Sequence, residues 1–163
     1  MFPDDIDVLA RRVVETAVAR GLMIATAESC TGGLVAGALT AVPGSSAALD
    51  RGFVTYSNTA KCEMLGVAAD LIEAHGAVSE PVARAMAEGG VNRSAATVSV
   101  AVTGVAGPGG GSDEKPIGLV HFAAFGPSGL IHAEHRFGDL GREGIRLESV
   151  RVALRLLLDR IGG

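Results

Sequence analysis

Residues 22–33 read Leu-Met-Ile-Ala-Thr-Ala-Glu-Ser-Cys-Thr-Gly-Gly, a short apolar run followed directly by small polar residues and glycines. The apolar run, residues 22–27, predicts a buried strand. Residues 34–41 are rich in Ala and Leu and predict a helix, so the chain changes from strand to helix around Ser29. In an open α/β sheet, ligands bind beyond the carboxyl ends of the strands. This stretch therefore predicts both a fold class and the position of a candidate site.

The other elements follow from apolar spacing and from capping signals. We predict helices over residues 4–20, from about 59 after an Asn58 N-cap, over 69–75, over 79–92 and over 143–161. We predict further strands over residues 52–56, 97–103, 118–125 and 130–137. The Gly-Pro-Ser-Gly turn at 126–129 joins the last two strands, which should pair antiparallel. We expect a three-layer α/β/α sandwich with a mixed, mostly parallel sheet of about five strands.

Length and composition exclude several classes of protein. With 163 residues, 48% of them hydrophobic, the chain can bury one core, so we expect a single domain over residues 1–163. Aromatic residues make up only 4% and the net charge is −4, which argues against nucleic-acid binding. Two cysteines do not make a disulfide scaffold. The acidic start does not resemble a secretory signal and the long uncharged stretch 29–49 is too polar for a membrane span, so we expect a cytoplasmic protein.

Ser29 and Cys30 are the candidate nucleophiles. A hydroxyl or thiol at a strand-to-helix turn lies beside the free N–H groups of the helix, which can bind an anion or form an oxyanion hole. A purely structural alternative is that Ser29 or Thr31 caps the helix. Cys30 is intrinsically the more nucleophilic residue, but most free cysteines are small buried hydrophobes. The residues alone leave the choice open.

Lys61 is the candidate base for such a nucleophile. It begins the helix after the second strand, at the same edge of the sheet as Ser29. The helix dipole and partial burial would both disfavour its charged form. The alternative is a solvated surface lysine. The four histidines are scattered along the chain, and those on predicted strands, His121 and His132, are expected to be structural, so we predict no metal site.

A second glycine-rich loop, residues 103–112, leaves the β-branched strand at the same edge. Backbone N–H groups of such loops form anion-binding nests, although a flexible connection is the simpler reading. Arg142 and Arg146 begin the last helix and are candidate phosphate or carboxylate ligands. Their alternative is a solvated helix face that pairs with Glu143.

Four motifs in order closely resemble the CinA family, in particular its C-terminal domain. They are Ala-Glu-Ser-Cys-Thr-Gly-Gly at 27–33, Val-Pro-Gly-Ser-Ser at 42–46, Gly-Phe-Val-Thr-Tyr-Ser-Asn at 52–58 continuing to Lys61, and Ala-Val-Thr-Gly-Val-Ala-Gly-Pro at 101–108. The similarity runs from about residue 6 to 160.

The resemblance implies a nicotinamide-nucleotide amidase, which hydrolyses the carboxamide of nicotinamide mononucleotide (NMN) to nicotinate mononucleotide and ammonia. It implies Ser29 as nucleophile, Lys61 as base and Tyr56 as an assisting group. Arg142 matches the family's functional arginine best. The resemblance further implies no metal or other cofactor, a pyridine mononucleotide as substrate, and a cytoplasmic homodimer or larger homo-oligomer.

The remaining expected substrate-binding residues surround these groups. Backbone donors for an oxyanion are expected at Cys30, Thr31 and Gly32, or at the turn formed by Gly44, Ser45 and Ser46. The phosphate is expected at Arg142 together with Thr103, Gly104, Ala106 and Gly107. Two alternatives remain: a non-catalytic nucleotide-binding or competence- and recombination-associated interaction module, and an amidase for another pyridine or nucleoside amide.

Overall fold

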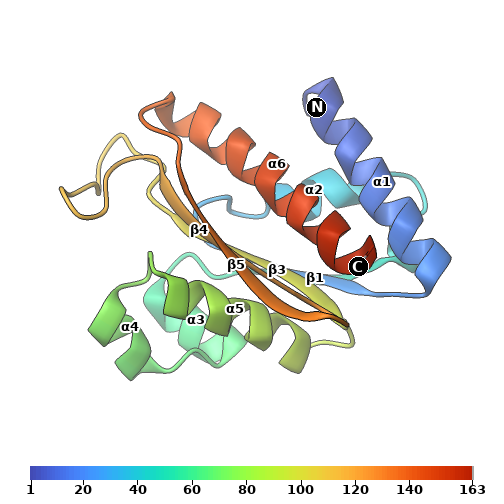
Figure 1. The fold of residues 1–163 in the computed structure, drawn as a ribbon, viewed down its shortest axis with the longest axis horizontal. Helices are drawn as coiled ribbons and strands as arrows, with labels where there is room; N and C mark the ends of the chain where they lie inside the picture. Colours follow the sequence, from blue (N-terminus) through green and yellow to red (C-terminus); the bar gives the residue numbers. More distant parts are fainter. Residues whose placement is uncertain (163) are drawn as a thin grey trace.

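A five-stranded sheet lies between two layers of helices in the computed structural model, which describes residues 1–162 (Figure 1). The strands are β1 (Ile24–Glu28), β2 (Leu49–Val54), β3 (Val98–Gly104), β4 (Leu119–Gly126) and β5 (Gly129–Arg136). Their order is β2-β1-β3-β4-β5. β1 is parallel to β2 and β3, whereas β4 is antiparallel to β3 and β5. The expected mixed sheet and three-layer fold are confirmed.

The helices divide between the two faces of the sheet (Figure 1). One layer contains α1 (Asp4–Arg20), α2 (Leu34–Thr40) and α6 (Gly141–Gly162), and the other contains α3 (Asn58–Leu65), α4 (Ala69–His75) and α5 (Glu80–Asn92). Successive side chains of β3 point to opposite faces of the sheet and so contribute to both cores. Val100 and Val102 pack against the first layer, and Ala101 packs against the second. Within residues 1–162, no helix combines the length and the apolar character needed to span a bilayer.

Two local expectations need correction. β2 begins at Leu49, three residues before the predicted start, and it ends before Tyr56. The strand includes the charged residues Asp50 and Arg51 because β2 lies at the edge of the sheet, where polar side chains remain accessible. The N-cap of α3 is Ser57 instead of Asn58, since Ser57 Oγ accepts a hydrogen bond from Ala60 N at 3.0 Å.

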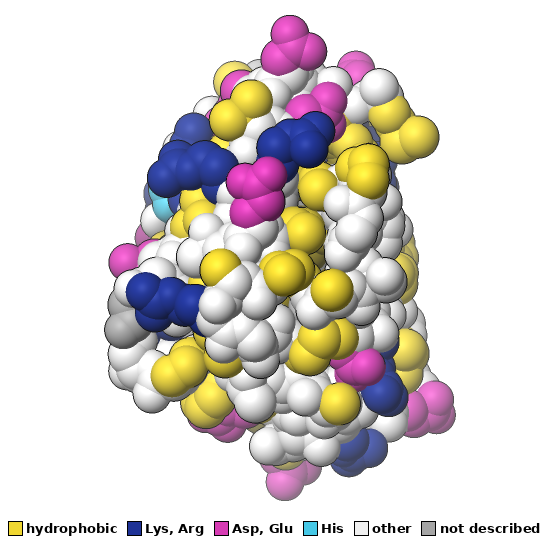
Figure 2. All heavy atoms as spheres, turned by 90° about the vertical axis from the view of Figure 1, so that its right-hand side faces the viewer, with side chains coloured by type: hydrophobic (Ala, Val, Ile, Leu, Met, Phe, Trp, Pro, Cys, Tyr) yellow, Lys and Arg dark blue, Asp and Glu magenta, His cyan; other side chains and the backbone are white. Residues whose placement is uncertain are grey.

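Parallel pairing brings the carboxyl ends of β1, β2 and β3 to one edge of the sheet. Ser29 and the glycine-rich loop after β3 therefore share that edge, as expected. The short 3-10 turn η1 (Ser45–Ala47) lies at the other edge, where Ile24 N at the start of β1 donates to Ala48 O at 2.7 Å. Figure 2 views the molecule from the side on which α1 ends, and shows hydrophobic side chains gathered between charged ones on that face.

Close contact between α3 and α5 fixes the position of the helix that carries Lys61. The contact occurs at Gly89, where an added Cβ would overlap the carbonyl of Leu65. Gly89 is buried in α5, so the two helices are in direct backbone contact at this point. A residue without a side chain is therefore required at this crossing.

We expect Gly89→Ala to lower the free energy of unfolding by about 2 kcal/mol or more, because overpacking of a close contact forces the helices apart. The matched control is Gly37→Ala in α2, where the nearest neighbouring atom to an added Cβ is 3.6 Å away. The free energy of unfolding of that variant should rise by about 0.5–1 kcal/mol, because Ala has a higher helix propensity than Gly. Urea denaturation of the three proteins measures both effects, and equal stability of the two variants would contradict the packing argument.

Candidate active site

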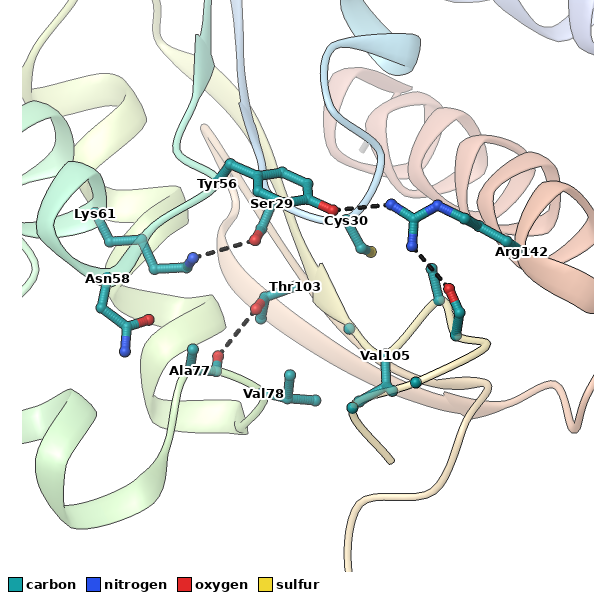
Figure 3. A pocket seen from close by; sticks show the side chains of 15 residues that line it. Ser29, Cys30, Tyr56, Asn58, Lys61, Ala77, Val78, Thr103, Val105 and Arg142 are labelled. Atoms are coloured by element: carbon teal, nitrogen blue, oxygen red, sulfur yellow. Dashed lines mark hydrogen bonds between the residues drawn. The ribbon is translucent and has the colours of Figure 1, made fainter. Parts of the chain in front are cut away.

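Lys61 and Ser29 meet at the carboxyl edge of the sheet. Lys61 Nζ lies 3.1 Å from Ser29 Oγ and donates a hydrogen bond to Thr55 O at 2.9 Å. Figure 3 shows the lysine side chain reaching from α3 toward the hydroxyl at the end of β1. A nucleophile and a base within hydrogen-bond reach are the geometric requirement for covalent catalysis.

Lys61 is buried, and only 1% of the surface of this residue is exposed to solvent. Burial lowers the pKa of Lys61 below its usual 10.5, because the charged form loses hydration. No carboxylate within residues 1–162 forms an ion pair that would restore the charge. The alternative of a solvated surface lysine is therefore wrong, and the amine is suited to act as a base.

Cys30 is less suited than Ser29 to be the nucleophile. It is 5% exposed, and burial raises the pKa of its thiol to about 11. A thiol with that pKa carries almost no thiolate at neutral pH. Figure 3 shows Lys61 directed at Ser29, with the sulfur of Cys30 on the other side of that serine. The geometry thus favours the hydroxyl.

The first turn of α2 is already occupied by a carboxylate. Glu28, which directly precedes Ser29, is wholly buried and accepts hydrogen bonds from Val35 N at 2.8 Å and Ala36 N at 3.0 Å. Thr26 Oγ1 donates to the same carboxylate. The helix N–H groups that were expected to bind a substrate anion instead hold Glu28, which joins β1 rigidly to α2.

A cleft of about 290 Å³ opens at this edge. It contains most of the predicted site residues, namely Ser29, Cys30, Tyr56, Lys61, Thr103, Gly104, Ala106, Gly107 and Arg142. Thr103 Oγ1 donates to Ala77 O at 2.9 Å and so ties the end of β3 to the segment before α5 (Figure 3). The volume lies near the lower end of the range for ligand pockets.

Arg142 bridges the two sides of the cleft at its rim. Its Nη2 donates to Tyr56 Oη and its Nη1 to Gly107 O, each at 2.8 Å (Figure 3). Tyr56 is 59% exposed, and its hydroxyl points to Arg142. Arg142 keeps further N–H groups that these two bonds do not use, so it can also meet an anion.

Five of the predicted binding residues do not line the cleft. Thr31 is wholly buried, and Gly32 lies on the side of the turn that faces Arg146. Gly44, Ser45 and Ser46 belong to the turn at the opposite edge of the sheet, where Gly44 borders a hollow beside α1. This turn follows a helix that returns the chain to the start of the next parallel strand, so it cannot reach the nucleophile.

Sequence reasoning missed several residues of the site. These are Asn58, Ala77 and Val78, whereas Val105, Gly109 and Gly110, which also line the cleft, belong to the glycine-rich loop already singled out as a whole. Ala77 and Val78 precede α5 and have no chemical signature in the sequence. The Ser79 N-cap signal did locate the start of α5, and it was the only local indication that this segment approaches the sheet edge.

The histidines lie outside the cleft. His121 Nδ1 and His132 Nε2 are 2.9 Å apart on neighbouring strands, and Glu80 is 3.2 Å from His132 Nδ1. Burial lowers the pKa of both imidazoles. The pair contributes a cross-strand contact.

Comparison with known proteins identifies relatives over nearly the whole chain. The family model for the CinA C-terminal domain matches residues 6–161, which confirms the resemblance seen in the motifs. CinA-like proteins of Anaeromyxobacter sp. (strain K) and Synechococcus sp. (strain RCC307) are 51% and 52% identical over 158 and 157 residues. Each match covers 96% of this chain but only 38% of the relative.

Solved structures share the fold. The competence/damage inducible protein CihA from Agrobacterium tumefaciens is 55% identical with a TM-score of 0.97, and the match covers 100% of this chain and 99% of that one. A CinA superfamily protein from Escherichia coli is 39% identical with a TM-score of 0.90, covering 97% and 92%.

We expect Lys61→Met to be more stable than the wild type at about pH 7, and the difference to shrink toward pH 10.5. The folded-state pKa of Lys61 is lowered, so between that pKa and 10.5 the unfolded chain binds more protons and wild-type stability rises with pH. Urea denaturation at several pH values measures this. Ser29→Ala, which keeps the amine, should retain the wild-type slope, whereas a pH-independent difference would contradict the burial effect.

Proposed function

This chain belongs to the CinA family, and we propose that it hydrolyses the carboxamide of nicotinamide mononucleotide to nicotinate mononucleotide and ammonia. The observation that carries the proposal is the buried Lys61 amine 3.1 Å from Ser29 Oγ in an open cleft. A cytoplasmic location and a homodimer or larger homo-oligomer belong to the same proposal.

The first half of the reaction is acylation of Ser29. Neutral Lys61 donates to Thr55 O and accepts the proton of Ser29 with its lone pair. The serine oxygen attacks the carboxamide carbon, and the C=O π electrons move to the oxygen as the tetrahedral intermediate forms. Lys61 then carries the proton as an ammonium group, close to the departing nitrogen.

The backbone N–H of Cys30 is the donor for the developing oxyanion. Cys30 lines the cleft and directly follows Ser29, and within residues 1–162 its N–H donates to no backbone or side-chain oxygen of another residue. Gly32 N is excluded because it donates to Ser29 O at 2.9 Å. One such donor typically contributes about 3–4 kcal/mol to transition-state stabilisation.

Breakdown of the intermediate needs a proton for the leaving nitrogen. It comes from the Lys61 ammonium, either directly or relayed through Tyr56, which gives its own proton to the nitrogen and takes one from Lys61; the Tyr56 hydroxyl oxygen accepts from Arg142 and so leaves that proton available. Either route returns Lys61 to its neutral form. The C–N bond breaks and ammonia departs. Water, deprotonated by Lys61, then attacks the acyl carbon, and Ser29 leaves with the proton returned from the ammonium group.

The cleft favours a mononucleotide as the substrate. A volume of about 290 Å³ is small for a dinucleotide, and Arg142 supplies free N–H groups at the rim for a phosphate. Phosphate binding far from the amide would orient the substrate without taking part in the chemistry.

We expect Ser29→Ala to reduce ammonia release from NMN by about 1,000-fold or more, since the covalent step is lost. Lys61→Ala should reduce it by about 100-fold or more, and Lys61→Arg should not restore it because a guanidinium does not lose its proton. Circular dichroism checks that the variants are folded. The assay compares NMN, nicotinamide and NAD, with NMN expected to be the best substrate.

Cys30→Ala is the matched control for the nucleophile and should retain most of the activity. If instead Cys30→Ala abolishes turnover and Ser29→Ala does not, the nucleophile is the thiol. Tight binding of NMN to the wild-type protein without ammonia release would favour the alternative of a non-catalytic nucleotide-binding module.

We expect kcat/KM to rise with pH as Lys61 loses its proton, with a midpoint below 10.5 because burial lowers the pKa of this amine. The measurement is initial ammonia release from about pH 6 to about pH 10, with the folded fraction recorded at each pH. A flat profile in fully folded protein would rule out a lysine base.

A further inference from the structure

Arg146 approaches the nucleophile from the side opposite the cleft. This half-buried residue of α6 donates from Nε to Cys30 O at 3.1 Å and from Nη2 to Thr31 O at 3.2 Å. A Cβ on Gly32 would lie 3.4 Å from Nη2, so the guanidinium is packed against the turn. Arg146 does not line the cleft, in contrast to Arg142, and the expectation that it is a phosphate ligand is therefore not supported.

Every carbonyl oxygen of the turn Ser29–Cys30–Thr31 is held. Ser29 O accepts from Gly32 N at 2.9 Å, Cys30 O accepts from Arg146, and Thr31 O accepts from both Arg146 and Leu34 N, the latter at 3.0 Å. At the other end, Ser29 N donates to Val102 O at 2.9 Å, which anchors the turn to β3. The peptide planes of the turn are thus fixed by contacts to two neighbouring elements.

These bonds determine where the amide protons point. In a trans peptide unit the carbonyl oxygen and the N–H point in opposite directions. Arg146 and Leu34 N, which donates to the same Thr31 oxygen at 3.0 Å, fix the Thr31–Gly32 unit, whose N–H in turn holds Ser29 O. That second bond fixes the Ser29–Cys30 unit, whose Cys30 N–H donates to no other residue within residues 1–162.

We infer that Arg146 is a positioning residue that holds the turn in the conformation presenting the Cys30 N–H beside the Ser29 hydroxyl. The inference rests on the proposed role of Ser29 as nucleophile. Without the guanidinium, Cys30 O has no other hydrogen-bond donor within residues 1–162 and Thr31 O keeps only Leu34 N. This turn, which contains a glycine with φ of 57°, is then held less firmly, and the Cys30 N–H is less well preorganised. A lysine cannot replace the planar fork that bonds two carbonyls at once.

The test measures the rate at which a fluorophosphonate probe labels Ser29, followed by mass spectrometry, alongside ammonia release from NMN. We expect Arg146→Met and Arg146→Lys each to slow labelling by about tenfold or more and to lower kcat by a similar factor. KM for NMN should change little, because Arg146 does not touch the cleft. Millimolar methylguanidinium should restore labelling of Arg146→Ala.

The matched control is Arg155→Met, which removes an exposed arginine from the same helix and should leave both rates unchanged. Thermal unfolding identifies any variant that does not fold. If Arg146→Met or Arg146→Lys does not fold, the effect of methylguanidinium on the labelling rate of Arg146→Ala decides the positioning role. Equal labelling of Arg146→Met and the wild type, or a change confined to KM, would overturn the inference.

The labelling assay also separates this inference from the choice of substrate. If the wild type is labelled at Ser29 but releases no ammonia from NMN, the substrate is wrong, and the labelling rates of the Arg146 variants still decide the positioning role. If Ser29 of the wild type is not labelled at all, the nucleophile assignment and this inference both fail.

Discussion

Burial of the Lys61 amine beside the Ser29 hydroxyl is the arrangement on which the rest of the site depends. An amine in a protein interior is costly when charged, and burial lowers its pKa. This cost arises at Lys61, where α3 follows the edge of the sheet. The amine forms hydrogen bonds with the Thr55 carbonyl and with the Ser29 hydroxyl. The same loss of hydration that destabilises the ammonium form produces a base near a hydroxyl.

The turn that carries Ser29 is held from several directions by side chains that do not line the cleft. Glu28 joins the end of β1 to the first turn of α2, and Arg146 on α6 engages the carbonyls that follow Ser29. Two charged side chains are thus used to orient backbone, one through N–H groups and the other through C=O groups. Because their partners are main-chain atoms, the orientation does not depend on the identity of the neighbouring side chains.

The rim of the cleft has a different organisation. Arg142 connects Tyr56, just beyond β2, to Gly107 in the loop after β3, and it remains exposed. A bridge of this kind links two segments that are otherwise separate at the surface, and a bound anion would share the same guanidinium. An anion bound at the rim would therefore be coupled to the position of Tyr56 through this one residue.

The sequence by itself determined the order of the elements, the parallel arrangement of the first strands and the edge that carries Ser29, since apolar periodicity and capping signals are local. It also supplied the motifs that identify the family. Only the tertiary structure decided that Lys61 is buried and that Glu28 occupies the start of α2. These outcomes depend on contacts between distant residues, such as Lys61 with Ser29 at a separation of 32 positions and Arg146 with Cys30 at 116. No local pattern encodes such contacts, because burial and hydrogen-bond partners are set by the packing of whole layers.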